Sequence, residues 1–272
     1  MKKFNLFALV SLILALSTVL SGCAANKDSD LRLYKLGVTG TDFEVWEDVS
    51  SRLEKDGIKL EIISFSDYVK PNQALAEGEI DLNAFQTVNY FEKFVENHQL
   101  DLSILGYSIV APMGVYSEKI KDLSELGEKF IVAIPNDESN GGRAIRFLEL
   151  LGYIKVNPDA GLAPTILDIS EYLTDITIVE MVATQIPRSL ADVDFAIINN
   201  GVAYEAGLTI ADDAIIYEDP EEPHMINYWN IVCCRTGDLE KDDYKKIIAE
   251  YNNDATRQKL IEKFGGQQIP VF

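Results

Sequence analysis

The sequence is poor in the side chains on which most enzymes and metal sites depend. It contains two histidines, His98 and His224, and neither has a serine or cysteine in a recognisable nucleophile motif nearby. Tight zinc or manganese binding needs several histidine, cysteine or carboxylate side chains that converge. A glycine-rich phosphate loop is also missing. We therefore expect no catalytic residue, no metal ion and no cofactor.

Cysteine is equally scarce, with three in the whole chain. Cys233 and Cys234 are adjacent within an apolar run. A disulfide between immediate neighbours is strained, because successive strand residues point to opposite faces. We therefore expect no disulfide framework, and we interpret both residues as small buried side chains of a strand.

Positive charge is in short supply, with 24 Lys and Arg against 44 Asp and Glu and a net charge of -20 at pH 7. Such a charge repels phosphate backbones and anionic lipid headgroups. We therefore expect no nucleic-acid partner and no direct attraction between the protein surface and a membrane. A solvated acidic shell that keeps an exported protein soluble is the simplest interpretation.

Long apolar runs are absent apart from residues 4–20, which follow Lys2 and Lys3. This run is short for a membrane span and is interrupted by polar residues. A positive start, a short apolar stretch and small residues before a cleavage point are typical of a secretory signal peptide.

The Ser21-Gly22 pair directly before Cys23 resembles the bacterial lipobox, in which the thiol receives a diacylglycerol before cleavage. We predict a signal peptide at residues 1–22 and a lipidated tether at residues 23–30, with the lipid on Cys23. The lipid then holds the body of the protein at a membrane surface. The alternative is an ordinary signal peptide with an incidental cysteine.

After the tether, apolar and β-branched runs alternate with amphipathic helical patterns, which favours α/β architecture with mainly parallel sheets and flanking helices. The predicted strands are residues 31–38, 58–64, 81–84, 102–106, 130–134, 176–179 and 195–198. The predicted helices are residues 43–56, 71–77, 88–97, 141–151, 202–206, 242–252 and 255–264.

The pattern restarts near residue 130, which predicts two lobes. Extended segments at residues 107–116 and 228–234 would cross between them, so that the C-terminal helices complete lobe one. We predict lobe one at residues 31–110 plus 231–272 and lobe two at residues 111–230. Two lobes joined by two crossings form a hinged clamp, with a ligand cleft at the carboxyl ends of the strands.

One binding signal is the stretch 135–143, which follows a predicted buried strand and opens a helix. Its Asn and Ser residues can cap the helix, and its glycines let a ligand approach the backbone N–H groups. Arg143 offers a planar fork suited to a carboxylate. A surface salt bridge is the alternative for Arg143.

A second signal is aromatic. Tyr68 and Phe85 follow predicted strand ends, and together with Tyr90 they could form an apolar wall for a side chain, including a thioether. For the neighbouring Phe65 and Phe91 we favour core packing.

The third signal is a pair of amides, Asn199 after a predicted strand and Asn230 in the second crossing. A strand-end asparagine binds an amino or carboxyl group with its donor and its acceptor. For Asn199, turn formation with Asn200-Gly201 explains the residue equally well.

Together these segments closely resemble the methionine-binding lipoproteins of the NlpA family, which are substrate-binding components of ABC importers. The resemblance covers nearly the whole mature chain. It is carried by FSDYVKPN at 65–72, DLNAFQ at 81–86, the stretch 135–143, PTILD at 164–168 and PRSL at 187–190.

The resemblance implies a two-lobed, periplasmic-binding-protein-like clamp that holds a free amino acid, with methionine favoured. By position, Arg143 would bind the carboxylate, Asn199 and Asn230 would hold the polar end, and the residues lining the side-chain pocket would be Tyr68, Phe85 and Tyr90. The implied partners are an ABC permease and ATPase complex, and the membrane through the lipid on Cys23. We expect a monomer, anchored in the bacterial cell envelope and exposed outside the cytoplasm.

The chain departs from the family pattern at Thr87, where a His is usual, and at Val202, where a Tyr is common. Thr87 should widen or repolarise the side-chain pocket. Another apolar amino acid or a methionine-containing dipeptide is therefore an alternative ligand. Two rival functions are an enzyme on the same scaffold and a surface lipoprotein for adhesion or immune contact.

Overall fold

The computed structural model describes residues 31–41 and 43–272. The predicted signal peptide and the whole predicted tether, including Cys23, lie outside the described residues. Residues 33–272 form one compact unit. No helix in the described ranges is long and apolar enough to span a membrane.

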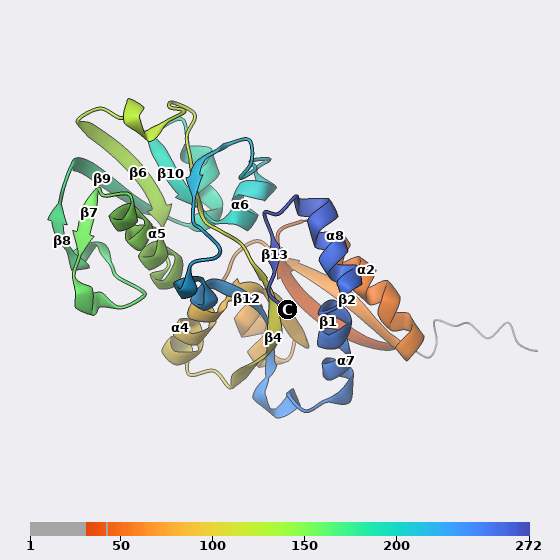
Figure 1. Cartoon of the computed structure of the whole chain (residues 1–272). Helices are drawn as coiled ribbons and strands as arrows, with labels where there is room; N and C mark the ends of the chain where they lie inside the picture. The colour runs from red at the N-terminus through yellow and green to blue at the C-terminus, as the bar shows by residue number, and fades with distance from the viewer. Residues whose placement is uncertain (1–30, 42) are drawn as a thin grey trace, which may run out of the picture. The chain divides into compact units, whose positions relative to one another are not determined.

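Six strands form the first sheet, in the order β13-β4-β12-β3-β1-β2 (Figure 1). Their bounds are β1 Arg32–Thr39, β2 Ile58–Phe65, β3 Leu82–Thr87, β4 Leu102–Val110, β12 Trp229–Arg235 and β13 Ile269–Pro270. Strands β1 and β3 are parallel, whereas β12 lies between β3 and β4 and runs antiparallel to both. This reversal arises because β12 brings the chain back from the second sheet.

Five strands form the second sheet, in the order β11-β5-β10-β6-β9. Their bounds are β5 Gly114–Tyr116, β6 Lys129–Pro135, β9 Asp175–Met181, β10 Phe195–Ile198 and β11 Ala214–Tyr217. Strands β10, β6 and β9 are parallel, and β5 is antiparallel to its neighbours. Both sheets are therefore mixed, with parallel β-α units beside antiparallel strands next to the crossings.

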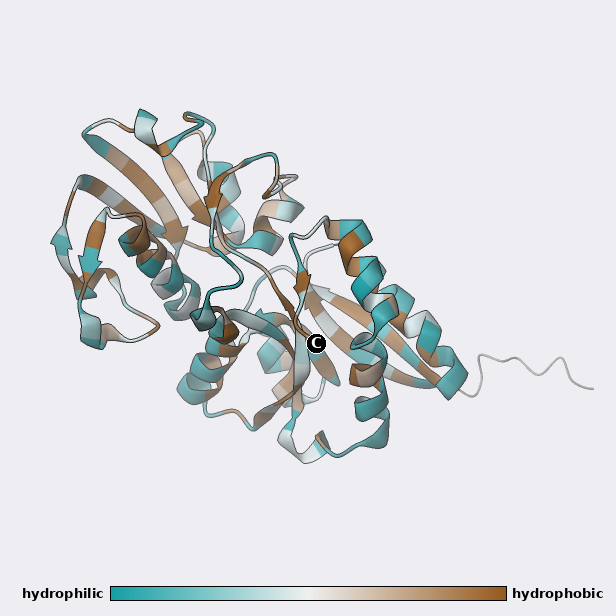
Figure 2. Cartoon of the chain, in the orientation of Figure 1, coloured by the Kyte–Doolittle hydropathy of each residue, from teal (hydrophilic) through white to brown (hydrophobic). Residues whose placement is uncertain are grey.

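The second sheet is covered on both faces. Val132 and Ile134 pack against helix α5 (Glu138–Leu150), whereas Ala133 between them packs with the 3-10 helix η6 (Ala183–Ser189) and helix α6 (Asn200–Glu205). Alternate strand residues point to opposite faces, so a continuous apolar strand fills two cores. Figure 2 shows brown, hydrophobic stretches along the strands of the second sheet.

The helices around the first sheet are α2 Glu44–Leu53, α3 Lys70–Glu77, α4 Val88–His98, α7 Asp242–Tyr251 and α8 Asp254–Phe264. Helix α2 forms because Val45, Val49 and Leu53 recur every four residues and give it one buried face. Trp46 in this helix stacks on Tyr251 of α7, with ring centroids 4.4 Å apart. The C-terminal helices therefore pack on the N-terminal part of the chain, as predicted.

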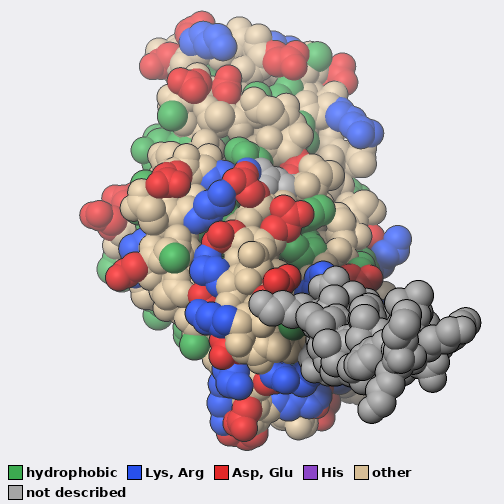
Figure 3. Space-filling view, turned by 90° about the vertical axis from the view of Figure 1, so that its right-hand side faces the viewer, with side chains coloured by type: hydrophobic (Ala, Val, Ile, Leu, Met, Phe, Trp, Pro, Cys, Tyr) green, Lys and Arg blue, Asp and Glu red, His purple; other side chains and the backbone are tan. Residues whose placement is uncertain are grey.

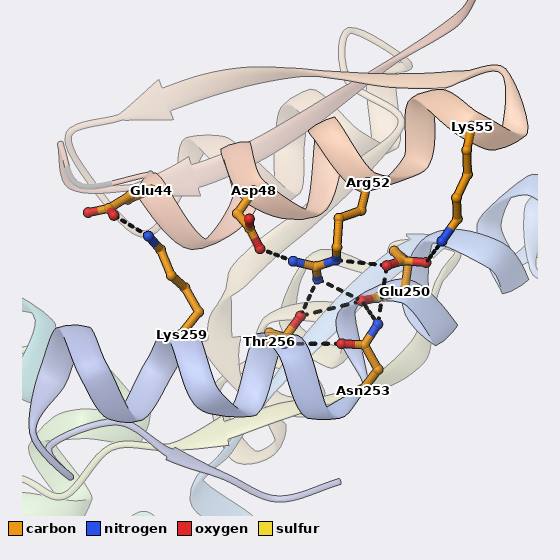
Figure 4. A network of polar contacts seen from close by, with 8 residues as sticks. All are labelled: Glu44, Asp48, Arg52, Lys55, Glu250, Asn253, Thr256 and Lys259. Carbon is orange, nitrogen blue, oxygen red and sulfur yellow. Dashed lines mark hydrogen bonds and ion pairs between the residues drawn. The ribbon is translucent and has the colours of Figure 1, made fainter.

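A polar network joins the same helices at the surface (Figure 4). Arg52 donates from Nε to Glu250 Oε1 at 2.7 Å, and Lys55 donates to Glu250 Oε2 at 3.0 Å. Glu44 at the start of α2 pairs with Lys259 of α8. On the side of the molecule shown in Figure 3, acidic and basic side chains are likewise interspersed and do not form a patch of one sign.

A buried amide cluster fixes the end of β3. Asn72 and Gln86 exchange hydrogen bonds of 2.7 Å in each direction, and Asn83 donates to Asn72 at 2.9 Å. Cys233 and Cys234 are free and buried in β12, as the sequence predicted, and burial raises the pKa of both thiols.

Several elements were not predicted, among them β11 and β13. Strands β7 (Ile154–Val156) and β8 (Ile169–Tyr172) pair as a separate antiparallel hairpin. We name the first sheet with its helices lobe one, and the second sheet with its helices lobe two. The boundaries at residues 110/111 and 230/231 remain a proposal.

Candidate functional site

A cavity of about 180 Å³ is lined by residues of both lobes. It lies where β3 of lobe one ends and where α5 and α6 of lobe two begin. The seven residues predicted to bind a ligand all line it: Tyr68, Phe85, Thr87, Tyr90, Arg143, Asn199 and Asn230. The structure therefore brings all seven around one space, and their contact with a ligand stays a prediction.

The lobe-one wall of this cavity is aromatic. The ring centroids of Tyr68, Phe85 and Tyr90 are 6.1 Å apart in each of the three pairs. The Tyr90 hydroxyl donates to the backbone carbonyl of Tyr68 at 2.8 Å, which fixes one ring relative to the other. Burial raises the pKa of both tyrosines, so the wall is uncharged at neutral pH.

Phe65 and Phe91 were predicted to belong to the core. Phe91 is buried in a cluster with Leu75 and Ile231, and Phe65 packs against the same cluster. That prediction is confirmed.

Thr87 has a structural role as well as a place in the cavity lining. It is the N-cap of α4, and its hydroxyl accepts from the backbone N–H of Tyr90 at 3.3 Å. The Thr87 hydroxyl therefore already accepts one hydrogen bond within the protein, and this bond helps to position Tyr90.

Arg143 is buried, with a side chain that is 3% exposed. Its Nε donates to Glu218 Oε1 at 2.8 Å and its Nη2 to Glu218 Oε2 at 2.5 Å. Nη2 also donates to the backbone carbonyl of Ala111 at 3.2 Å, and the guanidinium lies 4.2 Å from the ring centroid of Tyr228. The alternative of a surface salt bridge is wrong because this ion pair is buried.

Glu218 was missed by the sequence reasoning. It follows β11 in an acid-rich stretch where one more carboxylate carries no signal. Its Oε2 also accepts from the backbone N–H of Met113 at 2.6 Å. Within the described residues, the Nη1 atom of Arg143 makes no hydrogen bond to another protein group, so this edge of the guanidinium is the one left for a ligand.

The interpretation of the stretch 135–143 needs a correction. The N-cap of α5 is Asp137, whose side chain accepts from the backbone N–H of Asn140 at 2.8 Å. A Cβ on Gly141 would lie 2.7 Å from the Pro135 carbonyl, and one on Gly142 would lie 2.5 Å from the backbone of Ala163. These glycines serve close helix packing and do not line the cavity, whereas Asn140 and Arg143 of the same stretch do.

Asn199 is held by a side chain that was not predicted. Its Nδ2 donates to Asn140 Oδ1 at 2.7 Å, whereas its Oδ1 is buried without a partner among the described residues. Asn199 is the N-cap of α6, but its side chain makes no capping hydrogen bond. The neighbouring Asn200 is 3% exposed, and neither of its amide atoms has a partner in the described chain.

Asn230 completes the lining from β12. It stands opposite Thr87 in the ladder between β12 and β3 and is half-buried. The second crossing therefore carries a site residue, because it enters lobe one beside the carboxyl end of β3.

Direct contacts join the lobes around the cavity. Asn89 of α4 donates to Ser139 of α5 at 2.9 Å, and both side chains are buried. Thr41 donates its backbone N–H and its hydroxyl to the carboxylate of Glu205 at 2.9 and 2.7 Å. A second cavity, of about 750 Å³, adjoins the first and shares Tyr68 with it. The described residues contain no group of three or more His, Cys, Asp or Glu side chains placed to hold a metal ion.

Two α/β lobes with a cavity between them define a two-lobed substrate-binding protein, in which one wall is aromatic and the other carries Arg and Asn side chains. The chain belongs to the NlpA lipoprotein family, whose model matches residues 34–272.

The D-methionine-binding lipoprotein MetQ of Escherichia coli (strain K12) is 38% identical over 272 residues, covering 98% of each chain. Among solved structures, protein PG110 from Staphylococcus aureus is 39% identical with a TM-score of 0.85, covering 88% of this chain and 94% of that one. A nutrient binding protein from Burkholderia cenocepacia bound to methionine is 35% identical with a TM-score of 0.83, covering 88% of this chain and 100% of that one.

These comparisons confirm four expectations: the family, the two-sheet α/β fold, a binding protein in place of an enzyme, and a lipoprotein anchored in the bacterial cell envelope.

Proposed function

We propose that this protein binds free methionine in the cavity between its lobes and delivers it to an ABC permease and ATPase complex. The observation that carries the proposal is the arrangement around the cavity, which is lined by a buried arginine, two asparagines and three aromatic rings. Support comes from relatives named as methionine-binding and from a similar structure described as bound to methionine.

Each part of methionine has a complementary group in this arrangement. The carboxylate would accept from Nη1 of Arg143 and from the Asn230 amide, because a guanidinium edge binds carboxylates well. The ammonium group would donate to Asn199 Oδ1, which lacks another partner in the described chain. The thioether would lie on the rings of Tyr68 and Phe85, where sulfur and aromatic faces attract each other.

The charge balance of the site suits a zwitterion. Glu218 neutralises Arg143, so the buried polar wall has no net charge from this pair. A ligand with both an ammonium and a carboxylate adds no net charge to it, whereas a simple anion would leave one uncompensated charge in a poorly solvated space.

The adjoining cavity supports a second candidate ligand. It shares Tyr68 and Gly201 with the first, so a chain longer than one amino acid could extend from one space into the other. A methionine-containing dipeptide therefore follows free methionine as the next candidate.

The test is a thermal-shift titration of the mature protein in mild detergent, stripped of bound ligand by unfolding and refolding. L-methionine, D-methionine, leucine and methionyl dipeptides are compared, with L-methioninol as the control that lacks the carboxylate. A ligand at about 100 times its dissociation constant stabilises by roughly 2.7 kcal/mol. We expect a shift with methionine and none with methioninol.

A shift with leucine or a dipeptide alone would reassign the ligand but keep the receptor. If no compound shifts the melting temperature, the proposal fails. The proposed transport partners are tested separately, by whether the methionine-loaded protein stimulates ATP hydrolysis by the permease complex in proteoliposomes. For the proposed anchor, Cys23→Ser should abolish the incorporation of labelled fatty acid into the protein.

A further inference from the structure

Three side chains of lobe two form a hydrogen-bonded chain that begins at Asp137 and ends at the cavity. Asn140 Nδ2 donates to both carboxylate oxygens of Asp137 at 3.0 Å. Asn140 Oδ1 in turn accepts from Asn199 Nδ2 at 2.7 Å. All three residues belong to lobe two, so the chain does not depend on contact with lobe one.

The direction of this chain follows from its first member. A carboxylate only accepts hydrogen bonds, so Asn140 must turn its NH₂ group toward Asp137 and its oxygen toward Asn199. Asn199 must then turn its own NH₂ group toward Asn140. Its remaining amide atom, Oδ1, is an acceptor that has no partner among the described residues although it is buried.

From this geometry we infer that Asp137 and Asn140 are positioning residues, which fix the Asn199 amide so that it presents an oxygen to the ammonium group of an amino-acid ligand. This inference rests on the proposed function. Without such a chain the Asn199 amide could rotate by 180° and present its NH₂ group, which an ammonium group cannot use. Selection for an amine thus depends on Asp137, which does not line the cavity, and on Asn140, which lines it and also orients Asn199.

A matched pair of probes isolates this effect. L-methionine and 4-(methylthio)butanoate share the thioether chain and the carboxylate, and only methionine has the amino group. The measured quantity is the ratio of their dissociation constants, obtained by calorimetry with the full mature protein at pH 8. Burial raises the pKa of Asp137, so an alkaline buffer favours its ionised form. General damage to the fold weakens both probes alike and leaves the ratio unchanged.

Asn140→Ala is the decisive variant, because it interrupts the chain and keeps the charge of Asp137. We expect the ratio to fall about tenfold, in line with the loss of a hydrogen bond to a charged group. Asp137→Asn should also lower the ratio, since its side chain no longer dictates the direction of Asn140. A ratio in Asn140→Ala within about twofold of the wild type would overturn the inference.

The double variant Asp137→Asn with Asn199→Asp reverses the direction of the whole chain. The amide introduced at position 137 can cap α5 with its oxygen and donate to Asn140. Asn140 then donates to the carboxylate introduced at position 199, whose second oxygen faces the ammonium group. The double variant should regain the wild-type ratio or exceed it. A ratio no higher than in Asp137→Asn alone would contradict the inference.

The positioning role is also measurable without any ligand, which separates it from the proposed function. The free energy of unfolding in urea is measured for Asp137→Asn, for Asn199→Asp and for the double variant. The double variant should lose less stability than the sum of the two single losses, and this difference is the coupling energy. Asn140→Ala should remove most of it. A coupling that survives Asn140→Ala reflects charge repulsion alone and would refute the chain. If the wild type fails to bind methionine but the coupling behaves as expected, the proposed function fails and the positioning chain stands.

Discussion

Removal of the Glu218 carboxylate is expected to destabilise the protein severely. The two side chains of the Arg143–Glu218 pair are 3% and 8% exposed, so Glu218→Ala would leave a buried guanidinium without its counter-charge. Loss of one partner of a buried ion pair costs about 3–5 kcal/mol. The backbone N–H of Met113 would lose its acceptor as well, which places the expected cost in the upper part of that range.

The measurement is urea unfolding, supported by calorimetry. For a domain of this size 1 kcal/mol corresponds to about 2–4 °C, so a cost of about 4–5 kcal/mol should lower the melting temperature by roughly 8–20 °C. The matched control is Glu171→Ala, which removes the carboxylate of the exposed Lys155–Glu171 pair and should cost about 0–1 kcal/mol. Equal effects of the two substitutions would refute the reasoning.

A double variant separates stability from binding at the same pair. Arg143→Met with Glu218→Leu removes both charges, and an apolar replacement of a buried ion pair is often neutral or stabilising. This variant should recover most of the stability that Glu218→Ala loses, yet it should not bind methionine, because the donor for the carboxylate is gone. A double variant that still binds methionine would show that the carboxylate is held elsewhere.

Two further predictions concern pH and packing. Burial raises the pKa of Glu250, but hydrogen bonds from Arg52 and the charge of Lys55 outweigh burial and lower this pKa below 4.5. The ion pairs of Glu250 with Arg52 and Lys55 therefore stabilise the fold above that pH and lose this effect as the pH falls. The stability difference between wild type and Glu250→Gln should therefore be largest near pH 7 and shrink steadily toward about pH 3 in urea unfolding. Gly142→Ala places a Cβ 2.5 Å from the backbone of a packed loop and should cost about 1–3 kcal/mol, whereas Gly237→Ala, with nothing within 4 Å, should be near neutral.

The sequence could predict which residues surround the cavity because their positions follow from topology. Phe85 and Asn199 come at the ends of apolar strands, and the carboxyl ends of parallel strands meet at the same edge of a sheet. Asn230 was predicted from the second crossing, which has to enter lobe one beside such an edge. Their common location therefore depends on the order of elements, and periodicity reveals that order.

The partners of these residues could not be predicted in the same way. Glu218 is 75 positions from Arg143 in the sequence and stands in an acidic stretch, so composition hides it. Asp137 was overlooked as a cap because Asn and Ser in the same stretch are also good caps, and the glycines after them pointed to a later helix start. The β7–β8 hairpin was missed because its strands of three and four residues are too short for alternation to show.

The two walls of the cavity differ in how they are supported, and this suggests an order of events. Two members of the polar wall are held within lobe two, where Glu218 binds Arg143 and Asn140 binds Asn199, so this part exists before the lobes meet, whereas Asn230 comes from β12 of lobe one. The aromatic wall belongs to lobe one. A ligand only shifts the lobes toward closure if it gains contacts in the closed state that the open state lacks. An amino acid bound by its polar end to lobe two gains those contacts from its side chain, so recognition of the thioether and closure of the lobes are expected to be one step.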